Sequence, residues 1–168
     1  MNTLVTIRGN SASGKSTVAN AVQLRFDRSR CVVVPQDVVR RQMLREFDEP
    51  GAFNITLIEQ IALTCLASGG LVLVEGILDA QRYGPMLHRL AAVAPRSLHY
   101  GFDLTLAETL VRHAGRPLAA TVPEPLLARW YHGWQPLADI EEVRIDATWT
   151  VEQIVDRIHR DILAAHSS

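Results

Sequence analysis

The sequence has 168 residues, of which 48% are hydrophobic and 21% charged, and its formal net charge is −1. These values fit one globular domain with a real core, and they lack the basic excess of a dedicated nucleic-acid binder. Cys31 and Cys65 have no CxxC spacing, and no apolar stretch reaches the roughly 20 residues of a membrane span. We therefore expect one cytoplasmic domain over residues 1–168, with no disulfide framework, zinc site or membrane partner.

Apolar runs rich in β-branched residues alternate with longer segments of helical period along the chain. The expected strands are Leu4–Ile7, Cys31–Val34, Leu71–Val74, Ser97–Phe102 and Val143–Ile145. The expected helices are one that opens at Lys15, followed by Val38–Phe47, Ile55–Ala67, Tyr83–Val93, Thr105–Val111, Leu126–Trp134 and Val151–Ala165. Strands that are apolar on both faces and are each followed by a helix predict an α/β fold, with a parallel sheet covered on both sides.

The first expected strand runs into a loop that fits G-x-x-x-x-G-K-[ST] in full. Glycines allow backbone N–H groups to surround an anion, and the following helix adds the positive end of its dipole. Lys15 can reach the β- and γ-phosphates of ATP, and the Ser16 hydroxyl can ligate the Mg²⁺ that bridges them. The alternative is a strand–helix turn that binds nothing. The loop residues are Gly9, Asn10, Ser11, Ala12, Ser13, Gly14, Lys15, Ser16 and Thr17.

A carboxylate follows the second expected strand, where open parallel sheets bind their ligands. Asp37 comes just past Val34-Pro35-Gln36. An aspartate here can orient a substrate hydroxyl and accept its proton during phosphoryl transfer. Arg40, one helical turn on, can hold a polar or anionic substrate. The alternative is that Asp37 is the N-cap of the next helix, and the two roles are compatible.

A second acidic position lies at the end of the third expected strand. Glu75 can bind the water ligands of Mg²⁺ or the hydroxyl of Ser16, as the second acidic motif of phosphate-loop proteins does. Asp79, slightly further on, is the other candidate for this role. The alternative for Glu75 is a buried ion pair with Lys15.

Two arginines mark a candidate lid over about residues 112–124. Arg112 and Arg116 share a helix face at i, i+4, and the Gly115-Arg116-Pro117 sequence favours a hinge after them. Such a segment can close over bound nucleotide and bring guanidinium groups to the transferred phosphoryl group. The alternative is a solvated basic helix end, which the helix dipole favours.

Taken in chain order, these segments resemble small P-loop kinases of the polynucleotide kinase, gluconate kinase and chloramphenicol phosphotransferase type. The resemblance covers roughly residues 3–135. It implies a three-layer P-loop NTPase fold with a five-stranded parallel sheet, ordered 2-3-1-4-5. The motifs that carry it are Gly9–Thr17, Asp37-Val38-Val39-Arg40, Leu71–Gly76 and Thr109–Trp134, the last with an R-x-x-x-R pair and a helix led by Pro123.

The resemblance also implies roles for single residues. Asp37 is implied as the general base and Arg40 as a substrate contact. Arg116 is implied as a lid arginine on the phosphates, with Arg112 near the adenine. The third strand departs from the pattern, since Glu75 stands where polynucleotide kinases place an aspartate.

The leading hypothesis is an ATP-dependent kinase that transfers the γ-phosphoryl group to a hydroxyl of a small molecule, such as a nucleoside, a sugar or an antibiotic. One alternative is a polynucleotide 5′-hydroxyl kinase, for which a local basic patch is available despite the near-neutral charge. A second alternative is a nucleotide-binding regulatory ATPase without an acceptor. The basic patch available to the polynucleotide kinase alternative would comprise Arg25, Arg28, Arg30, Arg40, Arg41 and Arg45.

Overall fold

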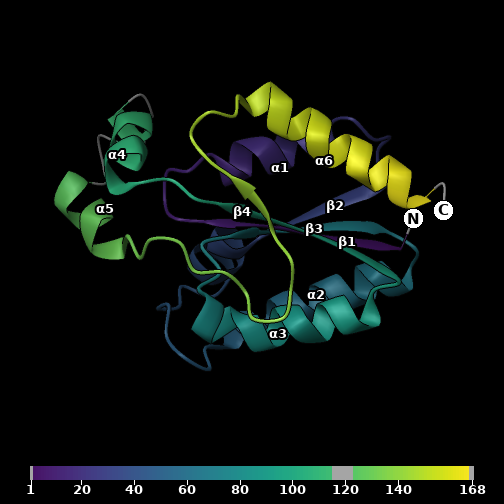
Figure 1. Cartoon of the computed structure of the whole chain (residues 1–168). Helices are drawn as coiled ribbons and strands as arrows, with labels where there is room; N and C mark the ends of the chain where they lie inside the picture. The colour runs from purple at the N-terminus through teal and green to yellow at the C-terminus, as the bar shows by residue number, and fades with distance from the viewer. Residues whose placement is uncertain (1, 115–122, 167–168) are drawn as a thin grey trace.

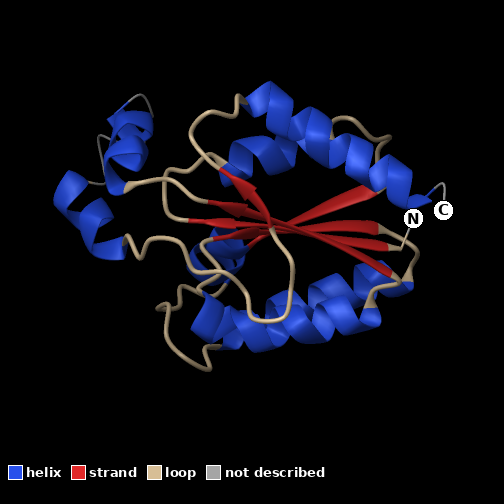
Figure 2. Cartoon of the chain, in the orientation of Figure 1, coloured by secondary structure: helices blue, strands red, loops and turns tan. Residues whose placement is uncertain are grey.

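The computed structural model describes residues 2–114 and 123–166, and it shows a parallel sheet between two layers of helices (Figures 1 and 2). The strands are β1 (Thr3–Gly9), β2 (Cys31–Pro35), β3 (Leu71–Gly76), β4 (Arg96–Phe102) and β5 (Val143–Ile145). The helices are α1 (Lys15–Gln23), the π-helix η1 (Val38–Met43), α2 (Phe53–Ala67), α3 (Ala80–Val93), α4 (Leu106–Ala114), α5 (Glu124–Trp130) and α6 (Val151–His166).

All strand pairs are parallel, and the sheet order is β2-β3-β1-β4-β5, which confirms the expected order 2-3-1-4-5. The central strand β1 pairs with β3 from Thr3 opposite Leu71, and with β4 as far as Gly9 opposite Phe102. Since parallel strands end at the same edge, the loop after β1 lies beside the segments that follow β3 and β4.

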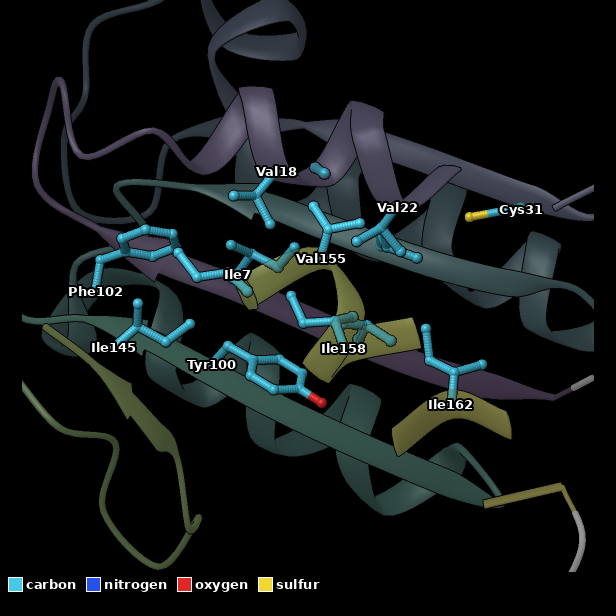
Figure 3. Close-up of a cluster of buried hydrophobic side chains, with 14 of the residues drawn as sticks. Ile7, Val18, Val22, Cys31, Tyr100, Phe102, Ile145, Val155, Ile158 and Ile162 are labelled. Carbon is cyan, nitrogen blue, oxygen red and sulfur yellow. The ribbon is translucent and has the colours of Figure 1, made fainter. Parts of the chain in front are cut away.

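The sheet is buried on both faces, because alternate residues of β1 enter two separate cores. Val5 and Ile7 belong to the core on the side of α1 and α6, part of which is shown in Figure 3. Leu4 belongs to the core on the side of α2 and α3. The helices α4 and α5 lie beyond the end of the sheet opposite to the chain termini (Figure 1). In residues 2–114 and 123–166, no helix is both long and apolar enough to cross a bilayer.

Two expected helices are shorter in the structure. The helix expected over Val38–Phe47 ends at Met43, where the Leu44 N–H bonds to the Val39 carbonyl five residues back, and Arg45 has a left-handed φ of 54°. This wider π turn is a feature often found at functional sites. The helix expected over Leu126–Trp134 begins at Glu124 and ends at Trp130, because the backbone becomes extended at the next residue.

A buried histidine makes stability depend on pH. His99 Nδ1 lies 2.8 Å from the Thr6 hydroxyl, and burial, helped by the charge of Arg8, lowers its pKa to about 4. The unfolded chain titrates near the ordinary value of 6.5, so it holds more protons than the native state between these two values. Stability should therefore fall as the pH falls through this window, by about 2 kcal/mol from pH 7 to pH 5.

The His99→Gln variant tests this effect by urea unfolding at pH 7 and pH 5. Glutamine does not titrate, so the free energy of unfolding of the variant should fall less between pH 7 and pH 5 than that of the wild type. His159→Gln, which removes a histidine packed edge-on against Phe26, is the control and should keep the wild-type pH dependence. Equal pH dependence in all three proteins would contradict the assignment to His99.

Candidate nucleotide and acceptor site

The phosphate-binding loop lies between the end of β1 and the start of α1, as expected. Gly9 has no room for a side chain, since a Cβ there would lie 2.6 Å from the Cβ of Phe102 on the neighbouring strand β4. Gly14 has a left-handed φ of 100° directly before α1. Backbone of this kind turns successive N–H groups towards an anion, next to the positive end of the helix dipole.

Two cationic side chains lie against the loop. The Lys15 ammonium donates to the Asn10 carbonyl at 2.7 Å and to the Ser13 hydroxyl at 3.3 Å, and the residue is only 7% exposed. Arg112 reaches over from α4 and donates to the Ser13 carbonyl at 2.7 Å. The other expected lid arginine, Arg116, lies outside the residues that the structure describes. Positive charge from two distant parts of the chain thus converges where a triphosphate would lie.

An acidic side chain faces the loop from β3. The Ser16 hydroxyl donates to Glu75 at 2.9 Å, and Glu75 is 3% exposed. Burial raises the pKa of Glu75, while the positive charge of Lys15 opposes that rise. A hydroxyl and a carboxylate are the hard oxygen ligands that Mg²⁺ prefers alongside phosphate oxygens and water, so these two residues fit a magnesium site.

The second acidic candidate has a structural role instead. Asp79 is the N-cap of α3, where its Oδ1 accepts from the backbone N–H groups of Gln81 and Arg82 at 3.0 and 3.1 Å. Capping holds Asp79 at the start of α3, whereas Glu75 is the carboxylate that contacts Ser16 of the loop. The geometry therefore favours Glu75 over Asp79 as the residue beside the metal.

The expected base lies at the start of η1 and is accessible. The Asp37 side chain is 58% exposed, and its Oδ1 lies 3.2 Å from both Arg40 and Arg41. Asp37 stands at the N-cap position of η1, as the alternative expected, but it has helical dihedral angles and its side chain makes no capping hydrogen bond with the residues that the structure describes. The carboxylate is thus oriented by two guanidinium groups and is open to a substrate.

A buried polar network fixes the segment that carries Asp37. The hydroxyl of Tyr83 lies 2.7 Å from Gln36, 2.8 Å from Asp48 and 2.9 Å from Asn54. Burial raises the pKa of Tyr83 far above its ordinary value, so the hydroxyl stays neutral. Sequence reasoning missed this network. Its one local signal is an asparagine on the inward face of α2 and a tyrosine on the inward face of α3.

Sequence reasoning also missed a contact that holds the loop in place. The Asn10 side chain donates to the Gly133 carbonyl at 3.1 Å and accepts from the His132 N–H at 3.0 Å, and the residue is 2% exposed. The side-chain amide of Asn10 thus pairs with one backbone carbonyl and one backbone N–H of the segment that follows α5. The phosphate-binding loop is therefore held against the segment that follows α5.

We expect Asn10→Ala to weaken both the fold and the loop. The variant leaves a partly buried N–H and a partly buried carbonyl without their partner, which should lower the free energy of unfolding by ~1–3 kcal/mol. The loosened loop should bind ATP about 10-fold more weakly by calorimetry, since about 1.4 kcal/mol of ordering is lost. Asn20→Ala, which changes an exposed asparagine of α1 outside the loop, should change both values little. Equal values for Asn10→Ala and Asn20→Ala would show that the Asn10 contacts carry no such role.

A cavity of about 560 Å³ lies beside the Asp37 segment. It is bounded by η1, by the segment between β3 and α3, and by the end of α5. The Arg41 guanidinium lies 5.3 Å from the ring centre of Trp130, so a cation–π contact joins η1 to α5 at its wall. The volume is in the range of small-molecule sites. A larger hollow of about 880 Å³ lies along β4 and α6, away from the loop.

Known structures share this fold. The APS kinase of Mycobacterium tuberculosis, solved with AMPPNP and APS, is 19% identical, with a TM-score of 0.70 over 96% of this chain and 97% of that one. A gluconokinase from Sinorhizobium meliloti is 16% identical, with a TM-score of 0.67 over 98% and 97%. A chain of the Pnkp1/Rnl/Hen1 RNA repair complex is 21% identical, with a TM-score of 0.59 over 76% of this chain and 42% of that one.

Neither a protein-family profile nor a curated protein matches the sequence. The structural similarities, all below 25% identity, establish the fold. The chain has the α/β fold of P-loop kinases, with an all-parallel sheet in the order 2-3-1-4-5.

Proposed function

We propose that the chain is an ATP-dependent kinase that transfers the γ-phosphoryl group to a hydroxyl of a small molecule. The observation that carries the proposal is the convergence of three features at one edge of the sheet. These are the loop with Lys15 folded over it, the Ser16–Glu75 pair, and a cavity beside the accessible carboxylate of Asp37. The kinase fold of the similar structures supports it. A cytoplasmic location, where ATP is available, accompanies the proposal.

In this proposal each group has a defined task. Lys15 and the lid residue Arg116 hold the phosphate oxygens and stabilise the charge that develops on them. Arg112, which lies against the loop at Ser13, contacts the nucleotide. Asp37 orients the acceptor hydroxyl and takes its proton. The hydroxyl oxygen forms a bond to the γ-phosphorus, while the bond from that phosphorus to the β,γ-bridging oxygen breaks and ADP leaves. Ser16 and Glu75 would hold a magnesium ion, whose positive charge would neutralise part of the charge of the phosphates.

An acceptor screen scored by ADP release tests the proposal. Nucleosides, sugars, hydroxylated antibiotics and 5′-hydroxyl oligonucleotides are each compared with water alone. A small molecule that raises the rate at least ~10-fold above water supports the kinase assignment. A rise with oligonucleotides only, which weakens steeply with added salt, would favour the polynucleotide kinase alternative. No rise with any acceptor, together with slow hydrolysis, would favour the regulatory ATPase.

A further inference from the structure

The cavity beside Asp37 differs from the rest of the molecule in its charge. Although the chain as a whole has a formal net charge of −1, the cavity wall is rich in guanidinium groups. The larger hollow along β4 is instead lined by more acidic than basic residues, with Asp139, Glu141 and Asp161 against Arg157. The arginines that line the cavity are Arg40, Arg41, Arg82 and Arg129.

The acidic groups nearby pair with three of these four cations. Arg40 and Arg41 share a single carboxylate oxygen of Asp37, at 3.2 Å from each. Arg82 pairs with Asp48 at 3.2 Å and lies 3.7 Å from Asp79. Asp37, Asp48 and Asp79 form these ion pairs, and Glu46 adds a further negative charge near Arg40. Arg129 pairs with no carboxylate among the residues that the structure describes.

Unsatisfied donors lie in the same wall. Arg129, on α5, makes neither an ion pair nor a hydrogen bond with the residues that the structure describes. The Nε atoms of Arg40 and Arg82 are buried and have no hydrogen-bond partner among those residues. Buried donors without partners are rare in native proteins, but these two Nε atoms are closed off from the cavity by surrounding atoms. Arg129 is therefore the unpaired group in this wall that a ligand can reach.

The remaining wall suits the rest of a small organic molecule. Phe47, which is exposed, and Trp130 both line the cavity and add aromatic rings to its wall. The Arg41 guanidinium lies over the Trp130 ring at 5.3 Å. A guanidinium stacked on a ring keeps its N–H edges free for the oxygens of an anion, which it can hold through two parallel hydrogen bonds.

We propose that the phosphoryl acceptor of this site is a small organic anion, which carries a phosphate, sulfate or carboxylate group in addition to the reacting hydroxyl. This inference rests on the proposed kinase function. Arg129 and Arg41 hold the anionic group, and the hydroxyl is turned towards Asp37. The cavity of about 560 Å³ holds such a molecule and not a nucleic-acid duplex.

Matched pairs of acceptors test the inference on the full chain with ATP and magnesium. Each pair consists of a neutral hydroxyl compound and its charged counterpart: a nucleoside and its 3′-monophosphate, a hexose and its aldonate, and an aryl alcohol with and without a sulfate. The measured quantity is the ratio of kcat/KM for the charged member to that for the neutral member. We expect this ratio to exceed ~30 for at least one pair, since a guanidinium–oxyanion contact contributes about 2 kcal/mol or more.

Substitutions in the cavity wall connect the preference to these arginines. Arg129→Gln and Arg41→Gln should each reduce the charged-to-neutral ratio about 10-fold or more, mainly through the KM of the charged acceptor. Arg89→Gln is the matched control, because Arg89 pairs with Glu59 on the outer surface of α2 and α3 and does not line the cavity. Its ratio should equal that of the wild type.

The outcomes separate this inference from the kinase assignment. Phosphorylation of neutral acceptors as fast as of charged ones, or a ratio that Arg129→Gln and Arg41→Gln leave unchanged, would overturn the anionic acceptor and leave the kinase standing. Phosphorylation of a 5′-hydroxyl oligonucleotide but of no mononucleotide would also overturn the small anionic acceptor. It would identify the acceptor as the end of a nucleic acid and leave the kinase assignment standing. No ADP release above the rate in water with any acceptor would remove the kinase function itself, and the inference with it.

Discussion

Asp37→Asn should lower kcat at least ~100-fold while the affinity for ATP stays nearly intact, because a general base contributes 10²–10⁴-fold to such reactions. Asparagine keeps the size of the side chain and can still accept a hydrogen bond from Arg40, but it cannot take up the hydroxyl proton. Single-turnover kinetics with a saturating acceptor measure the effect on transfer, and calorimetry measures the binding of ATP.

The control for this variant is Asp156→Asn. Asp156 is similarly exposed, at 53% against 58% for Asp37, and it also pairs with an arginine, Arg25, at 3.0 Å. Asp156 lies on α6, away from the loop, so Asp156→Asn should leave kcat and the affinity for ATP unchanged. If Asp37→Asn turns over within a few-fold of the wild type, Asp37 has no part in proton transfer.

Lys15→Ala should impair binding and turnover together. The ammonium group lies against the loop, where it contacts the Asn10 carbonyl and the Ser13 hydroxyl. Its removal should weaken ATP binding about 10-fold and lower kcat at least ~100-fold, since its charge acts on both the ground state and the transition state. Calorimetry and initial rates of ADP release measure the two effects.

Arg25→Ala is the control, because it removes one positive charge from an exposed ion pair at the far end of α1. The ATP affinity and the kcat of Arg25→Ala should match those of the wild type. An unchanged affinity and rate in Lys15→Ala would refute the assignment of the loop as a phosphate site, whatever the acceptor is.

The sheet and the loop could be predicted because their signals are local in the sequence. Each strand is a short apolar run, and burial of both faces of β1 follows directly from Leu4–Ile7. The loop motif needs its glycines for close packing, as Gly9 shows against Phe102. The parallel arrangement then brings Glu75 to Ser16, since the ends of β1 and β3 are neighbours in the sheet.

Other parts of the site could not be predicted, because they depend on contacts between distant segments. Asn10 stands at a variable position of the motif, and its partners lie more than 120 residues further along the chain. The early end of the helix at Met43 results from a π turn that hydrophobic periodicity does not distinguish from an α-helix. Arg129 meets Arg41 at one cavity only because α5 packs across η1.

The position of Lys15 has a practical consequence. All sixteen other basic residues in the sequence are arginines, so the chain contains one lysine, and its amine is folded into the loop. Incorporation of lysine labelled with ¹⁵N at Nζ therefore labels that amine alone. A single side-chain resonance then follows the filling of the phosphate site directly, without an engineered probe.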